Sequence, residues 1–475
     1  MKIFGKIALF LCFCVFIAPG ILFAQTEEEL LDQLLLGDGG EEVTTENEDD
    51  LLVENKSPFS LSGFGEFESG VSMGEDSFAD NSFFKNHGRI KLKPSYEIGS
   101  IRAYGDIDFF TNSGGSGETR DSGSLECVEA YIEGSGAILW KIGKQRFNWG
   151  VGDSYQPTDL FDRPDLRDSF MRDNDDRYTG VYAVSLKYLM GDYAVEAAVR
   201  PVTEKALGPV GFYAVETETI HTASGDLSTR YQDSNVITDL DKVSAGIRFG
   251  GTSGIVDWHL MYYSGMNRDL LYRSTIRSES SDLYLDLQPV YKRMNAVGAD
   301  LCIPLSKFNV RLEGIFSPDM PALSSITNSD LAAGLTSIGA GASSADLQSI
   351  KHREYFNYTA GFDINLWGDD GTVYLEWMQA RYLNEDNVEP ILLTDILVLK
   401  AEDYLFNQFL KLSASSLIRI RDKKPGVTLK GEAEYDFKNG MTMAVGTYAF
   451  ISNGDEYIDM IDDKDLAYLE MKFEF

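Results

Sequence analysis

The feature that most constrains the fold of this chain is an alternation of apolar and polar residues with a period of two. It recurs in segments of about ten residues from residue 59 to the end of the sequence. Successive side chains of a β-strand point to opposite faces, so each segment predicts a strand with one apolar and one polar face. The clearest segments are 101–109, 193–200, 243–249, 308–316, 358–366 and 429–437. A soluble sandwich also contains amphipathic strands, but the repetition without a linker favours a closed transmembrane β-barrel.

The connections between these segments alternate in length. Short turns are predicted at 97–100, 134–137, 190–192, 250–254, 305–307, 368–371 and 438–440. Long polar loops are predicted at 74–86, 112–123, 148–177, 202–240, 266–290, 318–352, 385–403 and 453–463. Short turns at one end and long loops at the other are typical of a barrel inserted from the periplasm. The sequence therefore predicts an all-β fold, a transmembrane antiparallel up-and-down β-barrel over residues 58–475.

The number of strands follows less directly from the pattern. About 17 candidate segments are found, and a single-chain barrel with both ends on one side needs an even number. We predict about 16 strands, within a range of roughly 14 to 18. The segment 390–420 is ambiguous, because it fits one strand or two, and 391–400 also fits a helix in a loop.

Residues 1–24 have the pattern of a signal peptide. Lys2 and Lys6 precede the apolar run 7–17, and Ala24 is the expected cleavage position. A membrane anchor is the alternative, but the run is shorter than the ~20 residues that span a bilayer. No later apolar run reaches ~18 residues, so we expect no transmembrane helix after the signal.

Residues 25–57 form an acidic, largely disordered leader. The segment 26–55 is rich in Asp and Glu and has no basic residue before position 56, so it cannot bury enough surface to fold alone. Leu30, Leu31 and 34–36 have helical spacing, which predicts a short amphipathic helix. The leader is either a flexible periplasmic tail or a docking helix for a partner. The net charge of −33 argues against nucleic-acid binding, because phosphates would be repelled.

The last predicted strand ends on an aromatic residue. Leu469, Met471, Phe473 and Phe475 alternate with polar residues. This pattern resembles the C-terminal recognition segment of outer-membrane barrel proteins. The resemblance implies the barrel-insertion machinery as a partner, and outer-membrane lipid and lipopolysaccharide as surroundings.

The segment 141–168 carries a motif. It combines a strand ending in Gly-Lys-Gln with Trp-Gly and a following Pro-x-Asp, and it resembles a poorly characterised family of Gram-negative outer-membrane porin-like proteins. The matching residues are Gly143, Lys144, Gln145, Trp149, Gly150, Pro157 and Asp159. The acidic leader is also similar to members of this family. The resemblance implies a barrel and a role in transport, and it implies no particular solute.

Two sets of charged residues are candidates for selectivity. Residues facing the lumen set the selectivity of a channel, and the charged members of the alternation are expected there. The predicted lumen-lining residues are Arg89, Lys91, Lys93, Arg102, Glu376, Glu432, Glu434 and Asp436. The basic early strands and the acidic late strands form either two arcs that face one another across part of the lumen or a mixed lining satisfied by salt bridges.

The second set lies in the loop 148–177, which is dense in charges of both signs. Such a loop either folds inward and narrows the pore or stays at the surface. Its candidate constriction residues are Asp159, Asp162, Arg163, Asp165, Arg167, Asp168 and Arg172. Trp149 is expected to be an interface aromatic or a packing anchor for this loop.

The remaining residues offer little for catalysis or metal binding. Cys127 and Cys302 lie on distant predicted strands, so a disulfide is not favoured. His259 is expected to face inward beside Asp257, but no nucleophile is identifiable near it. The acidic clusters lack the spacing of calcium loops. We therefore predict no enzyme activity, no cofactor and no metal.

These features favour an outer-membrane channel for the passive or substrate-preferring passage of small solutes. A homo-oligomer is possible, because barrel porins are often trimers, but the sequence identifies no subunit interface. One alternative is a non-conducting surface barrel with an adhesive or structural role, which the long loops 202–240 and 318–352 suggest. Another is a transporter of hydrophobic compounds, which the charged lumen face disfavours.

Overall fold

The computed structural model describes most of the predicted barrel region. The described residues are 57–73, 84–113, 122–165, 177–204, 219–222, 225–231, 242–268, 271–279, 282–366, 371–384, 386–388, 395–421, 424–454, 456–459, 461–462 and 464–475. The predicted signal peptide, 1–24, and all but the last residue of the predicted leader, 25–57, lie outside them.

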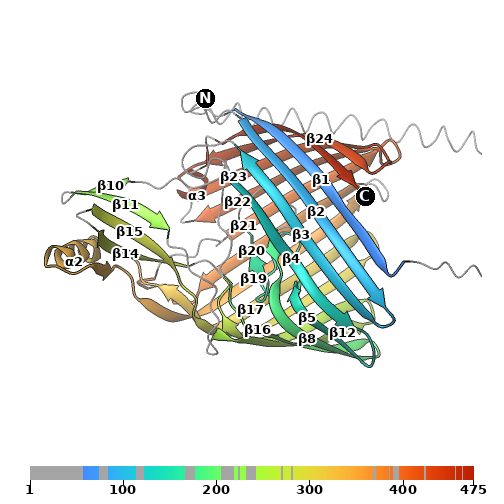
Figure 1. Ribbon diagram of the computed structural model, residues 1–475, viewed down its shortest axis with the longest axis horizontal. Coiled ribbons are helices and arrows are strands. Elements are labelled where there is room, and N and C mark those ends of the chain that lie inside the picture. The colour runs from blue at the N-terminus through green and yellow to red at the C-terminus, as the bar shows by residue number, and fades with distance from the viewer. Residues whose placement is uncertain are drawn as a thin grey trace, which may run out of the picture.

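Eighteen strands form one closed antiparallel sheet. They are β1 (Phe59–Ser72), β2 (Phe84–Ile98), β3 (Ile101–Ser113), β4 (Ser122–Gly134), β5 (Ile138–Gln145), β8 (Val181–Met190), β9 (Tyr193–Arg200), β12 (Ser244–Ser253), β13 (Val256–Met266), β16 (Arg293–Leu305), β17 (Phe308–Leu323), β19 (Ile350–Leu366), β20 (Gly371–Tyr382), β21 (Asp395–Leu405), β22 (Leu410–Arg421), β23 (Lys424–Asp436), β24 (Met441–Ser452) and β25 (Leu466–Glu474). Each pairs with the next in chain order, and β1 pairs with β25 to close the barrel (Figure 1). The predicted antiparallel up-and-down barrel is confirmed.

The strand number is 18, at the upper limit of the predicted range and above the 16 expected. The ambiguous segment 390–420 contains β21 and β22, so the predicted loop 385–403 and the possible helix at 391–400 are wrong from Asp395 onward. The turn between these strands has positive φ angles at Phe406, Asn407 and Gln408 (54°, 54° and 64°). It contains neither glycine nor proline, so the usual turn signals are missing.

The outer face of the barrel is apolar. Leu125, Ile98 and Leu260 are 72%, 64% and 55% exposed, and they belong to a large set of exposed aliphatic and aromatic side chains on the barrel strands. An apolar band of this kind suits the hydrocarbon core of a bilayer. Among the described residues, no helix is both long and apolar enough to cross a membrane.

The two ends of the barrel differ. At the short-turn end, turns such as 99–100, 191–192 and 254–255 join consecutive strands. At the opposite, long-loop end, segments from three loops form a separate five-stranded sheet, which projects beyond the barrel in Figure 1. The strands of this surface module are β10 (Thr219–Thr222), β11 (Gly225–Tyr231), β14 (Tyr272–Glu279), β15 (Asp282–Pro289) and β18 (Ser344–Asp346). β11 pairs with β15 in parallel, which joins two loops that are separated by a barrel hairpin.

One face of the surface module is covered by helix α2 (Asn328–Gly339). Ile276 of β14 is fully buried on this face, where Leu331 of the helix packs. On the other face Asp286 is fully buried between Arg230 and Arg277, with an N–O distance of 2.9 Å to each. The predicted polar loops therefore contain a folded module with its own small core.

Candidate functional site

The chain between β5 and β8 folds into the lumen. We call residues 146–180 the inserted loop; 146–165 and 177–180 are described, and they include the short strands β6 (Arg163–Pro164) and β7 (Tyr178–Thr179). Carboxylates on the barrel wall accept hydrogen bonds from the backbone amides of this loop. Backbone groups must find partners when they are buried, so these carboxylates replace the water that a surface loop would use.

Glu313 on β17 is the first of these carboxylates. It is 4% exposed and accepts hydrogen bonds from the amides of Val151 (2.7 Å), Gly152 (2.9 Å) and Thr158 (2.7 Å). A Cβ on Gly150 would lie 2.8 Å from Oε1 of Glu313. The close approach of the loop to this carboxylate therefore requires glycine at position 150.

Glu376 on β20 is the second anchor. It accepts hydrogen bonds from the successive amides of Asp153 (2.8 Å), Ser154 (3.0 Å) and Tyr155 (3.1 Å). Beside it, Arg311 of β17 forms an ion pair with Asp153 of the loop. Burial raises the pKa of Asp153, and Arg311 opposes this shift. Hydrogen bonds to ionised groups are the stronger class, so the loop tip is firmly held.

A pair of carboxyl groups organises the loop internally. Asp162 accepts hydrogen bonds from the amides of Phe147 (2.9 Å) and Asn148 (3.2 Å), and Asp159 accepts one from the amide of Asp162 (3.2 Å). Both carboxyl groups are fully buried. Burial raises the pKa of each, and the neighbouring Asp159 raises the pKa of Asp162 further. The guanidinium of Arg268, 3.9 Å from the Asp159 carboxylate, partly offsets the cost of this burial.

An apolar core joins the loop to the wall. Trp149 and Phe161 are 1% and 0% exposed, with ring centroids 5.1 Å apart, and Phe161 packs edge-on against Tyr263 of β13 at 5.2 Å. Arg200 of β9 donates to the backbone oxygen of Phe161 at 2.7 Å. The structure thus places Trp149 in the packed core of the inserted loop and not at a membrane interface.

The candidate constriction residues take different positions. Asp159 and Asp162 are internal to the loop, as described above. Arg163 pairs with Glu126 of β4 at 3.2 Å, and the amide of Asp165 donates to the backbone oxygen of Arg177 at 2.7 Å. The other three candidates, Arg167, Asp168 and Arg172, lie outside the described residues.

The residues of the family-like motif lie at the start of the inserted loop. Gly143 has a φ of 135°, which disfavours any other residue there. Lys144 pairs with Glu126 at 3.0 Å, and the side chain of Gln145 donates to a backbone oxygen of β8 at 3.0 Å. Trp149, Gly150 and Asp159 have the roles given above, and Pro157 is buried beside them. The motif therefore positions the loop at its exit from β5.

Three of the four predicted lumen-lining residues of the early strands are paired with carboxylates. The shortest N–O distances are 2.6 Å from Arg89 to Asp108, 3.9 Å from Lys91 to Asp106 and 3.1 Å from Arg102 to Glu133. Lys93 lies on β2 with its partner residue Ser62 on β1. Positive and negative groups therefore alternate along this part of the wall.

The acidic candidates lie on two strands, β20 and β23. Glu376 anchors the loop, Glu432 pairs with Lys430 at 3.0 Å, and Asp436 pairs with Lys438 at 2.9 Å at the short-turn end. Glu434 lies opposite Ala444 on β24. Only β24, β25 and β1 separate β23 from β2, so the acidic residues of β23 lie on the same side of the lumen as the basic residues of β2. Glu376 differs, because six strands, β21–β25 and β1, lie between β20 and β2.

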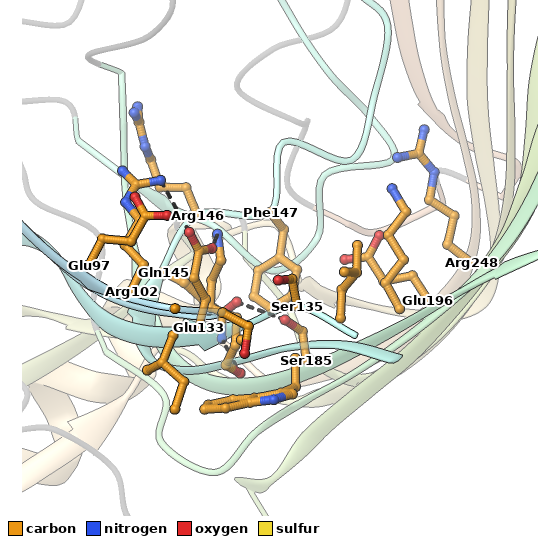
Figure 2. A pocket seen from close by; sticks show the side chains of 18 residues that line it. Glu97, Arg102, Glu133, Ser135, Gln145, Arg146, Phe147, Ser185, Glu196 and Arg248 are labelled. Atoms are coloured by element: carbon orange, nitrogen blue, oxygen red, sulfur yellow. Dashed lines mark hydrogen bonds and ion pairs between the residues drawn. The ribbon is translucent and has the colours of Figure 1, made fainter. Parts of the chain in front are cut away.

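Beneath the inserted loop, at the short-turn end, the lumen forms a chamber of about 630 Å³. Figure 2 shows Phe147 of the loop between a group that includes Arg102 and Glu133 and a group that includes Glu196 and Arg248. The turns 99–100 and 134–135 contribute to its outer edge. A volume of this size accommodates small organic solutes.

The histidine candidate has a different partner from the one expected. Nδ1 of His259 lies 2.7 Å from Asp300 on the neighbouring strand β16, and Arg248 pairs with the same carboxylate at 2.8 Å. Asp257 lies two residues away along β13 and accepts from Thr252 at 2.5 Å. Residues opposite one another on paired strands are closer than residues two apart on one strand, which explains the difference. Among the described residues, no cluster of three or more His, Cys, Asp or Glu could hold a metal ion.

Glu313 cannot be distinguished from other lining residues by sequence. It alternates with apolar residues, as any lining residue does, and it lies 155 residues after Thr158 of the loop. Cys127 and Cys302 are both free thiols on β4 and β16.

Comparisons with known proteins give structural likenesses only. No family model matches the chain, and no curated protein matches it. A mutant of the Rh. blastica porin aligns with 13% identity over 88% of this chain and 100% of the porin, with a TM-score of 0.38. OmpF of Salmonella typhi, in a complex with daunomycin, aligns with 10% identity over 88% of this chain and 97% of OmpF, with a TM-score of 0.42. A loop-deletion mutant of OmpT, an outer membrane protein of Vibrio cholerae, aligns with 10% identity over 88% of this chain and 100% of the OmpT chain, with a TM-score of 0.39.

Proposed function

We propose that this chain is a channel of the bacterial outer membrane for small polar solutes. The observation that carries the proposal is the inserted loop, which is folded inside a closed barrel and anchored there by buried carboxylates. A loop that is fixed at this depth narrows the lumen to a defined passage. The apolar outer face and the polar lining support a pore through a bilayer.

The passage is expected to run between the inserted loop and the wall formed by β21–β25 and β1–β3. The named contacts of the loop run to β4, β9, β13, β17 and β20, which are on the other part of the barrel. On the proposed open wall, Lys400 pairs with Glu402 at 2.8 Å and Lys430 with Glu432 at 3.0 Å. Such a wall favours hydrated, polar solutes over hydrophobic ones.

The orientation follows from the loops. We infer that the short-turn end faces the periplasm and that the surface module lies outside the cell, as in barrels inserted from the periplasm. The acidic leader is then periplasmic. The terminal strand β25 is the segment that the insertion machinery would recognise, and lipopolysaccharide would surround the long-loop end. We propose no catalytic activity.

The test is single-channel conductance of refolded protein, residues 25–475, in planar bilayers. We expect stable current steps from the wild type. The double variant Glu313→Gln, Glu376→Gln should give larger and noisier steps, because the loop loses both anionic anchors. The matched control is Glu279→Gln, an exposed carboxylate of the surface module that pairs with Arg230 outside the barrel, which should keep the step size. Folded protein without current steps in any of these forms would overturn the proposal.

A second candidate function is attachment to a surface or partner through the surface module. The parallel pairing of β11 with β15 favours it, because unconstrained loops would not need to fold together. This role is compatible with a channel. A variant lacking the module that conducts normally but no longer adheres to cells or matrix would support it.

A further inference from the structure

The chamber at the short-turn end has an unusual concentration of basic side chains. Five of them line it: Arg102, Lys141, Arg146, Lys187 and Arg248. Three carboxylates, Glu97, Glu133 and Glu196, line it as well. The lining therefore has more cationic than anionic groups, in a chain whose net charge is strongly negative.

The carboxylates that balance two of these cations lie outside the lining. Arg146 pairs with Glu129 at 3.4 Å, and Arg248 pairs with Asp300 at 2.8 Å. Neither Glu129 nor Asp300 lines the chamber. The guanidinium groups are thus nearer to a solute in the chamber than their counter-charges are, so the local potential is positive.

Other contacts hold the cations in place. Glu133 lies between Arg102 (3.1 Å) and Lys141 (3.5 Å), and the Lys141 ammonium sits 4.1 Å from the ring centroid of Tyr131. Lys187 is exposed, and its partner residue across the β8–β9 pair is Glu196. Arg102 and Lys141 are therefore held on the wall before any solute arrives, which lowers the entropic cost of binding.

We propose that this chamber attracts and transiently binds small organic anions whose charge is carried by carboxylate, sulfonate or phosphate oxygens. The inference rests on the proposed channel function for its physiological meaning, and it names the class of solute. Arginine forks match such oxygens with two hydrogen bonds. Phe147, at the boundary with the inserted loop, offers an apolar surface to the organic part of the solute.

The position of the chamber has a directional consequence. It lies on the short-turn side of the inserted loop, so an anion that passes the narrow segment is concentrated on the side proposed to be periplasmic. A channel with charge at one mouth conducts unequally in the two directions. We therefore expect anion-preferring current that rectifies, and that loses both properties in about 1 M salt, where screening acts over roughly 3 Å.

The decisive experiment measures the potential in the chamber without needing current. In a Cys127→Ser, Cys302→Ser background, Ser135→Cys places a reporter thiol on the chamber lining and Ser306→Cys places a control thiol in the β16–β17 turn, at the same end of the barrel but outside the lining. Each thiol is reacted with anionic sulfonatoethyl and cationic trimethylammonioethyl methanethiosulfonate. The ratio of the two rates cancels differences in thiol ionisation and reports the local charge.

The expected ratio of anionic to cationic rates is higher at position 135 than at 306 by about threefold. Lys187→Glu should lower the ratio at 135 by a similar factor, and Glu196→Gln should raise it, with neither changing position 306. Equal ratios at 135 and 306, or a higher rate for the cationic reagent at 135, would overturn the anion site. Because the reagents act without current, a channel that fails to conduct overturns the proposed function while the ratios still decide the inference.

Discussion

Thr158 of the inserted loop donates both its amide and its hydroxyl to one oxygen of Glu313 on β17, at 2.7 Å in each case. The same hydroxyl lies 2.7 Å from the backbone oxygen of Trp149. One threonine thus ties the second half of the loop to its first half and both to the barrel wall.

Thr158→Val should loosen the inserted loop without unfolding the barrel. Valine has nearly the same shape but removes the hydroxyl donor, and a hydrogen bond to a charged group contributes about 1.5–3 kcal/mol. We expect amide hydrogen exchange in residues 147–158 to quicken by roughly tenfold, while the strands stay protected. Thr372→Val is the control, since that hydroxyl makes a longer bond of 3.4 Å to Asn365 at the barrel rim. Equal exchange rates in wild type and Thr158→Val would contradict the assigned tie.

Phe161→Ala should release the loop from its apolar core. The ring is fully buried against Trp149 and Tyr263, and such truncations cost about 3–5 kcal/mol. We expect larger, less regular current steps and protease cleavage within the loop. Ile276→Ala removes an equally buried side chain, but from the surface module. It should leave the current unchanged, and a similar effect on current from both variants would show that general destabilisation is the cause.

The inserted loop should be more tightly held at mildly acidic pH than at alkaline pH. Burial raises the pKa values of Asp159 and Asp162, and a raised carboxyl pKa means that protonation favours the folded loop. The stabilising contribution is fully present below the ordinary Asp pKa of 3.8 and is lost as the pH rises through the raised values. Current noise that grows as the pH rises above the ordinary Asp pKa of 3.8, and grows less in Asp159→Asn, is the expected result. Noise that falls over this range would refute it.

Cys302 should react with water-soluble thiol reagents through the lumen. Its register partners Asp257 and Arg311 belong to the set of lumen-facing residues, whereas Cys127 is exposed next to the outward-facing Leu125. In a Cys127→Ser protein in lipid vesicles, a membrane-impermeant reagent should label Cys302 within minutes. In a Cys302→Ser protein, Cys127 should stay unlabelled because lipid covers it. The reverse pattern would mean that the faces of β4 and β16 are exchanged.

The barrel could be predicted from the sequence because its determinants are local. In 308–316, every second residue is apolar, and such a period of two persists whatever the neighbouring strand is. The strand number depended on a single turn, 406–409, where Phe406, Asn407 and Gln408 adopt positive φ angles without a glycine. Because this turn contains neither glycine nor proline, its composition does not mark the end of one strand and the start of the next.

The contacts that anchor the loop could not be predicted from the sequence, for a different reason. The charges of Asp159 and Asp162 marked the loop as a candidate, but its main anchor, Glu313, has the sequence surroundings of any lining residue. What distinguishes it is contact with the amides of Val151 and Gly152, and backbone donors leave no trace in the sequence. The pairing of His259 with Asp300 was missed similarly, because strand partners follow from the register alone.

The parallel pairing of β11 with β15 also sets an order of assembly. β11 ends at Tyr231 and β15 begins at Asp282, and the barrel hairpin β12–β13 lies between them in the chain. In the proposed orientation, the two strands can meet only after both loops have been carried across the membrane on either side of that hairpin. The surface module is therefore completed late, and an antibody that recognises only its paired form would report, on intact cells, that insertion of the central hairpins has finished.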